Sequence, residues 1–135
     1  MEPMAEQTRE RLTALRNGML RLHKSLLDSE RALYERDVQR ITGPGHFLGL
    51  VMEDPWFAWL RELSQFIVMV DETLDLEEPA TKTDADRLIA QARALLSPSE
   101  GRAGFAGKYY EIMQRDANAV LAHRDMMQVF GALTP

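Results

Sequence analysis

The first forty residues hold the pattern that most restricts how this chain can fold. Between Pro3 and Gly43 there is no proline and a single glycine, Gly18. Apolar side chains recur there at steps of three and four residues, the spacing of one face of an α-helix. They are Leu12, Leu15, Met19, Leu22 and Leu26. The pattern predicts one long helix over residues 4–40, with Pro3 at its start.

A second inward line follows if this helix continues at 3.6 residues per turn. It consists of Leu20, His23, Leu27, Glu30, Tyr34, Val38 and Ile41. A straight helix of this length spans about 55 Å, whereas a compact chain of this size has a radius of gyration of about 14 Å. Part of the helix is therefore expected to overhang. We expect a second copy to cover Leu12, Leu15 and Met19; the alternative is that residues 1–10 fray.

Two more helices are predicted in the middle of the chain. The Gly-Pro-Gly turn at 43–45 introduces a short apolar helix within residues 42–55, and Asp54 with Pro55 then starts the second main helix. That helix keeps a regular apolar rhythm from Trp56 to Leu74. Its segment 66–70 is apolar nearly all round, which is typical of a helix buried on several sides. Val68 and Met69 are therefore expected to be covered by neighbouring helices or by a second copy.

Two further main helices complete the prediction. Thr83 is expected to cap the third helix, which ends before Pro98, and residues 97–100 resemble a capping box. Glycines at 101, 104 and 107 indicate either a flexible connection or a close backbone approach. The last helix then runs from Phe105 to Phe130. No segment combines alternation of polar and apolar residues with enrichment in β-branched residues, so we predict a single all-α domain over 1–135. It is a four-helix bundle with a long N-terminal helix and a short extra helix before the second.

Composition excludes several classes of function. Sixteen basic against 21 acidic residues give a net charge of −5, which argues against nonspecific nucleic-acid binding. The absence of cysteine excludes disulfides and thiolate metal sites. The first residues carry acids and no apolar run, so neither a secretory signal nor a membrane anchor is expected, and the cytoplasm is the predicted location. The acidic stretch 71–78 is either a solvated helix end or a docking surface for a basic protein.

Four polar residues on inward helix faces are candidates for a metal site. His23 and Glu30 lie two turns apart on the first helix, as do Asp116 and His123 on the last. If these helices are antiparallel, His23 lies level with His123 and Glu30 with Asp116, which could hold a divalent metal. If they are parallel, each histidine can face a carboxylate as an ion pair. Asp116 can instead cap a helix that restarts after Arg115. The Glu-x-x-His and His-Glu-x-x-His patterns are missing, so no cofactor is predicted and the metal is kept as an alternative.

Aromatic residues at helical spacing indicate either core packing or an apolar ligand pocket. The candidate ligand-binding residues combine these aromatics with the polar set. They are His23, Glu30, Tyr34, Trp56, Trp59, Tyr109, Asp116 and His123. None of the sequence patterns of hydrolases, nucleotide-binding loops or dinucleotide-binding folds is found. An enzyme is therefore not favoured, and no catalytic residue is predicted.

Two stretches carry a resemblance. They are LHKSLLDSERALYERD at 22–37 and GPGHFLGLVMEDPWFAWLRELSQFIVMVDE at 43–72. The Leu-His-Lys, Glu-Arg-x-x-Tyr-Glu and Asp-Pro-Trp-Phe-x-Trp-Leu-Arg elements resemble those of a group of short bacterial all-helical proteins with no established activity. The resemblance covers residues 22 to about 125. It implies a bacterial, cytoplasmic helical protein and assigns no catalytic residues, although it draws attention to His23, Glu30, Arg31 and Tyr34.

The sequence thus supports two hypotheses about function. The first is a non-catalytic interaction protein that forms a homodimer through Leu12, Leu15, Met19, Val68 and Met69, with another protein as a further partner. The second is a bundle that binds a metal or a small ligand, either as a binding protein or as an enzyme, through the inward histidines and carboxylates.

Overall fold

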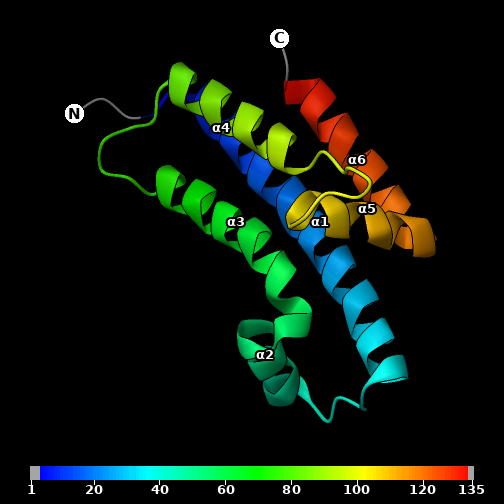
Figure 1. Ribbon diagram of the computed structural model, residues 1–135. Coiled ribbons are helices and arrows are strands. Elements are labelled where there is room, and N and C mark those ends of the chain that lie inside the picture. Colours follow the sequence, from blue (N-terminus) through cyan, green and yellow to red (C-terminus); the bar gives the residue numbers. More distant parts are fainter. Residues whose placement is uncertain (1–3, 134–135) are drawn as a thin grey trace.

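The computed structural model describes residues 4–133, and this part of the chain is all-α, as predicted (Figure 1). It contains six α-helices and one 3-10 helix. Their bounds are α1 Glu6–Asp37, α2 Pro44–Glu53, η1 Pro55–Leu60, α3 Arg61–Leu74, α4 Lys82–Leu95, α5 Phe105–Arg115 and α6 Ala117–Leu133. The four predicted main helices correspond to α1, η1 with α3, α4, and α5 with α6. The short extra helix is α2. No helix between residues 4 and 133 has the length and apolar character to cross a membrane.

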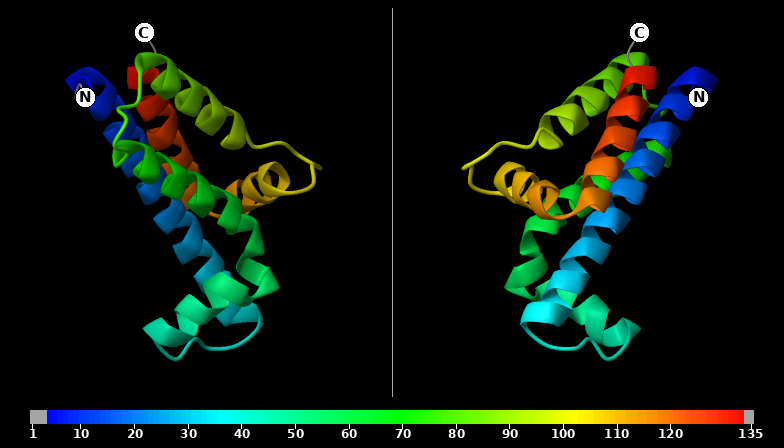
Figure 2. Two further views of the ribbon diagram at one scale, coloured as in Figure 1. Left: turned by 90° about the vertical axis from the view of Figure 1, so that its left-hand side faces the viewer. Right: turned by 90° about the vertical axis from the view of Figure 1, so that its right-hand side faces the viewer.

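The long helix α1 is the centre of the fold, and α6 lies antiparallel beside it (Figure 2). Arg11 donates from Nη2 to the carbonyl oxygen of Leu133 at 3.1 Å. Seven residues further along α1, a Cβ on Gly18 would lie 3.1 Å from Sδ of Met126, which is seven residues before Leu133 on α6. The two helices therefore keep one register over two turns, and glycine at position 18 lets them approach closely.

The predicted dimer interface on the first helix is wrong. Leu12, Leu15 and Met19 are fully buried within a single copy of the chain. The reason is that three helices pack around the N-terminal half of α1. Besides α6, α3 reaches it through an ion pair of Asp71 with Arg16 at 2.9 Å, and α4 through one of Asp86 with Arg11 at 2.8 Å. The expected overhang is not found at the other end of α1 either, because Tyr34, three residues before its end, is buried against Trp56 and Phe57. Residues 6–10 belong to the helix, whereas residues 1–3 of the segment expected to fray lie outside the described residues.

Local capping rules explain where the middle helices begin. The carboxylate of Asp54 accepts a hydrogen bond from the backbone N–H of Trp56 at 2.8 Å, as predicted, although the first turn that follows is the 3-10 helix η1. The predicted cap of the next helix is displaced by one half-turn. Thr81, not Thr83, caps α4, because its hydroxyl accepts from Asp84 N–H while the Asp84 carboxylate accepts from Thr81 N–H. This reciprocal pair satisfies two N–H groups that a helix start leaves open.

The predicted capping box at 97–100 does not start a helix, because α5 begins only at Phe105. Gly101 and Gly104 have φ angles of 73° and 78°, in the left-handed region that favours glycine. Gly107 is required because of a close backbone contact rather than because of its φ angle. A Cβ there would lie 1.7 Å from the carbonyl oxygen of Arg102. The glycine spacing thus reflects a tight turn folded against the first turn of α5.

Candidate functional site

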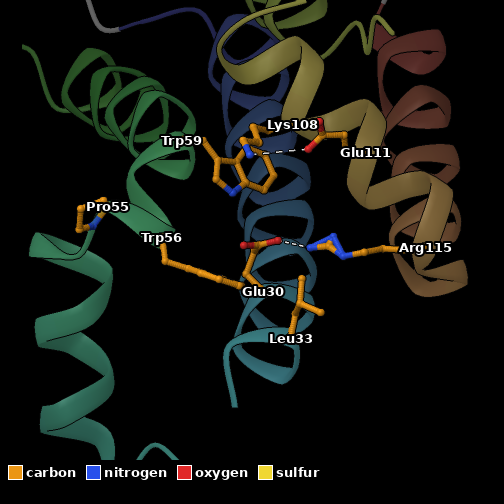
Figure 3. A pocket seen from close by; sticks show the side chains of 8 residues that line it. All are labelled: Glu30, Leu33, Pro55, Trp56, Trp59, Lys108, Glu111 and Arg115. Carbon is orange, nitrogen blue, oxygen red and sulfur yellow. Dashed lines mark hydrogen bonds and ion pairs between the residues drawn. The ribbon is translucent and has the colours of Figure 1, made fainter. Parts of the chain in front are cut away.

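A pocket of about 370 Å³ opens between α1, η1 and α5 (Figure 3). Glu30 and Leu33 from α1 form its back, and η1 contributes Pro55, Trp56 and Trp59. The third wall is a single face of α5, on which Lys108, Glu111 and Arg115 are spaced by three and four residues. The volume is at the lower end of the range for small-molecule sites.

An ion pair lies at the bottom of this pocket. The guanidinium of Arg115, the last residue of α5, donates from Nη2 to Oε1 of Glu30 on α1. The Glu30 side chain is only 8% exposed, whereas that of Arg115 is 32% exposed. The pair therefore joins a buried carboxylate to a guanidinium that still reaches solvent. At the rim, Lys108 and Glu111 form a looser pair at 3.7 Å, and both side chains are exposed.

The two indole rings are held by neighbouring aromatic side chains. Trp59 packs against Phe105 with ring centroids 5.4 Å apart. Trp56 meets Tyr34 edge to face at 5.6 Å. Such contacts stabilise ring orientation beyond simple burial, so this wall of the pocket is preformed.

One polar atom in the wall has no partner. Nε1 of Trp56 is buried and finds no hydrogen-bond acceptor among the residues that the structure describes. A buried donor left without an acceptor costs about 1–3 kcal/mol. Water or a ligand oxygen admitted beside Trp56 would supply the missing acceptor.

His123 and Tyr109 form a second polar contact, away from the pocket. The Tyr109 hydroxyl hydrogen-bonds Nδ1 of His123 at 2.6 Å, and the two rings meet edge to face at 5.3 Å. Burial raises the pKa of Tyr109 above its usual range, and burial lowers the pKa of His123 below 6.5. The phenol therefore stays protonated and the imidazole tends to stay neutral. Because Tyr109 is fully buried, the contact is suited to fixing α5 against α6.

The remaining two candidate residues, Asp116 and His23, also lie outside the pocket. Asp116 separates α5 from α6, and its carboxylate accepts a hydrogen bond from the backbone N–H of Asn118 at 2.9 Å. This matches the alternative in which Asp116 caps a helix that restarts after Arg115. His23 is half-buried on α1, and burial lowers its pKa as well.

The antiparallel arrangement required for the metal hypothesis is present, but the expected cluster is not. Glu30 is paired with Arg115 rather than placed against Asp116, and His123 is paired with Tyr109. Within residues 4–133, no three histidine, aspartate or glutamate side chains gather closely enough to hold a metal ion. The four predicted metal ligands therefore do not form one site.

The structure brings together only part of the predicted ligand-binding set. Glu30, Trp56 and Trp59 line the pocket, and Tyr34 supports Trp56 from behind. His23, Tyr109, Asp116 and His123 do not line it. Sequence reasoning missed the residues from α5. Their signal was available as three charged residues on one helix face, a pattern more often typical of a solvated surface.

A second feature is an apolar surface on α2, which extends from the end of the molecule opposite the start of α1 (Figure 1). None of the ten residues of α2 is buried. Phe47 packs edge to face on Phe57, and Arg31 lies over the Phe47 ring at 4.7 Å. The opposite side of the helix is exposed. We call it the α2 outer face, and it consists of Gly45, Leu48, Gly49 and Met52.

The predicted interface residues of α3 also remain uncovered. Val68 is 53% exposed and Met69 is 39% exposed. The expectation that neighbouring helices of the same chain cover them is wrong, because α1 and α4 pack on the opposite side of α3, where Leu63, Ile67 and Val70 are buried.

Comparison of the chain with protein-family models, with curated proteins and with solved structures finds no match. The resemblance to short bacterial helical proteins stays a prediction, and the function has to be argued from the geometry.

Proposed function

We propose that this protein is an interaction protein that forms a homodimer through the α2 outer face. The observation that supports this is the exposure of two large apolar side chains on one side of a short helix. Leu48 is 59% exposed and Met52 is 64% exposed. They lie four residues apart and so project from the same face. We also place the dimer in the cytoplasm, which a chain without cysteine suits.

The shape of the α2 outer face is complementary to itself. In an antiparallel pair of α2 helices, Leu48 would lie over Gly49 of the partner subunit, and Met52 over Gly45 of the partner subunit. A two-fold axis repeats both contacts, as an isologous interface requires. Glycine inside a helix costs about 1 kcal/mol relative to alanine. No contact within residues 4–133 requires glycine here, because a Cβ at Gly45 or Gly49 would meet no atom within 4 Å beyond its chain neighbours and its own helix backbone.

Charge favours the same antiparallel pairing. The N-terminus of α2 has no side-chain cap, since Gly43 occupies the capping position. Glu53 stands exposed at the other end of the helix. In the antiparallel dimer, Glu53 would approach the open N–H groups of the partner helix, where a carboxylate is stabilised by the helix dipole. A parallel pair would bring the two Glu53 side chains together, which like charges oppose.

The small size of the α2 outer face limits the expected affinity of the dimer. Two ten-residue helices bury less than the roughly 1,200 Å² of a standard stable interface. We therefore expect a dimer that dissociates in the micromolar range.

Sedimentation velocity over a micromolar concentration series tests the proposal. The unaltered chain should shift from monomer to dimer as concentration rises. The double variant Leu48→Glu/Met52→Glu should stay a folded monomer, because it places two charges in the α2 outer face. A matched control is Val68→Glu/Met69→Glu, which alters the exposed apolar residues of α3 and should still dimerise. A monomer at every concentration, or a dimer lost only in the α3 variant, would contradict the α2 interface.

A further inference from the structure

We propose that the pocket between α1, η1 and α5 binds a small aromatic zwitterion, a molecule of the amino-acid type with one ammonium and one carboxylate group. This inference does not depend on self-association. It follows from how the charges of the pocket are already paired and from the nature of its walls.

The deep ion pair excludes ligands that compete for it. A simple anion that drew Arg115 away would leave the Glu30 carboxylate buried and unpaired, because that side chain is only 8% exposed. A buried charge without its partner is strongly unfavourable. A simple cation would have to compete with the guanidinium that Glu30 already holds. The ligand must therefore leave this pair intact.

The rim pair is the one that a ligand can open. Lys108 and Glu111 are 3.7 Å apart, with side chains 58% and 67% exposed. An exposed pair of this kind contributes little stability. A ligand with only one charge can pair with one of these residues and leaves the other to water. A zwitterion replaces both halves of the pair, with its carboxylate on Lys108 and its ammonium on Glu111.

The apolar walls of the pocket favour an aromatic group in the uncharged part of the ligand. The indole side chains of Trp56 and Trp59 from η1 and the aliphatic side chain of Leu33 from α1 lie around the pocket (Figure 3). A planar ring packs against indoles in offset or edge-to-face geometry.

Three related probes separate the charge requirements of the site. Phenylalanine carries both charges, phenylacetate carries only the carboxylate, and 2-phenylethylamine carries only the ammonium. Trp56 and Trp59 are the two tryptophans of the chain, so selectively excited tryptophan fluorescence reports directly on the pocket. We expect phenylalanine to bind about tenfold more tightly than either single-charge probe.

Two variants of exposed rim residues provide the decisive comparison. Lys108→Met should lower the affinity for phenylalanine to that for 2-phenylethylamine, and Glu111→Gln should lower it to that for phenylacetate. Lys24→Met removes an equally exposed lysine of α1 and should change nothing. The Leu48→Glu/Met52→Glu variant should bind phenylalanine as the unaltered chain does, which separates this site from the α2 interface.

Three results would overturn the inference. Phenylacetate binding as tightly as phenylalanine would mark a plain anion site, and 2-phenylethylamine doing so would mark a cation site. No fluorescence change with any probe at millimolar concentration would mean that the pocket does not bind this class of molecule.

Discussion

Arg115 donates a hydrogen bond to Glu30 across 85 residues of sequence, and this contact ties the end of α5 to the C-terminal part of α1. The two partners are unequally buried, so their removal should have unequal costs. Arg115→Met leaves the Glu30 carboxylate buried without a counter-charge and should lower the free energy of unfolding by about 2–3 kcal/mol. Glu30→Gln leaves a guanidinium that water can reach and should lower it by about 1 kcal/mol.

Urea unfolding followed by circular dichroism measures both values. Arg124→Met is the matched control, since Arg124 is exposed and its nearest carboxylate, Asp125, is 4.0 Å away. Equal losses for the two pocket variants would show that the burial of Glu30 does not govern the energy of the pair.

Gly107 should be the least replaceable glycine in the chain. Gly107→Ala forces a Cβ to within 1.7 Å of the Arg102 carbonyl oxygen, which neither backbone segment can avoid without moving. Overpacking of this kind costs about 3 kcal/mol or more. Gly131→Ala is the control, because a Cβ there meets nothing within 4 Å and alanine favours the helix by up to about 1 kcal/mol. The midpoint temperature of thermal unfolding should therefore fall for Gly107→Ala and rise for Gly131→Ala. A mild effect at position 107 would mean that the turn before α5 adjusts freely.

Stability should fall as the pH drops below about 6.5. Burial lowers the pKa of His23 and of His123, so each histidine binds its proton more readily in the unfolded chain. Where the unfolded state holds more protons, stability rises with pH and is lost on acidification. The loss should begin near the pKa of an unfolded histidine and level off once the folded protein is protonated too.

Substitution of the histidines checks this assignment. His23→Gln/His123→Gln should flatten the stability profile between neutral pH and about pH 5. A further decline at lower pH should remain, because the Thr81 backbone N–H holds the pKa of Asp84 below 3.8 and a hydrogen bond from Arg11 lowers that of Asp86. An unchanged slope near pH 6 in the double variant would mean that other groups control it.

Leu15→Glu should unfold the protein, whereas Val68→Glu should leave it folded. Leu15 is fully buried between helices, and Val68 is 53% exposed on α3. A buried unpaired carboxylate costs several kcal/mol, whereas an exposed one on a helix surface changes stability by about 0.5 kcal/mol or less. Circular dichroism distinguishes the two directly. A folded Leu15→Glu variant would mean that the core around α1 opens easily.

The first turn of α4 provides a test of helix capping. Thr81→Ala removes the hydroxyl that accepts from Asp84 N–H and should cost about 1 kcal/mol. Thr83→Ala, two residues later inside the helix and exposed, should be neutral or slightly stabilising, since alanine is the better helix former. Equal effects in chemical denaturation would show that the capping box contributes nothing.

The periodicity of apolar residues was sufficient to predict the helices, but it could not predict which segments pack over their apolar faces. The leucine spacing of α1 identified a buried face correctly, because that face is a property of the helix itself. It could not say that α3, α4 and α6 of the same chain bury Leu15, since that depends on contacts between distant segments. The same limit explains Val68, whose apolar character suggested burial although α3 packs on its other side.

The candidate site was likewise predictable from the sequence only in part. The sequence left antiparallel and parallel arrangements of α1 and the last helical segment open, and the antiparallel one, which the structure has, places Glu30 beside the junction of α5 and α6. Asp116, however, is used to start α6, so the neighbouring Arg115 meets Glu30. A shift of one residue at a helix break turned an expected pair of carboxylates into an ion pair. Capping residues decide such breaks, and several alternatives are often close in energy.

The packing of α1 against α6 also bears on how the protein is made. Arg11 is synthesised 122 residues before its partner carbonyl at Leu133. Helical domains are usually dominated by contacts between near neighbours in sequence, and such domains fold fast. Here the central helix emerges long before its main neighbour exists. The leucine face of α1 therefore lacks α6 while the intervening residues are synthesised, a period in which binding by a chaperone would be most valuable.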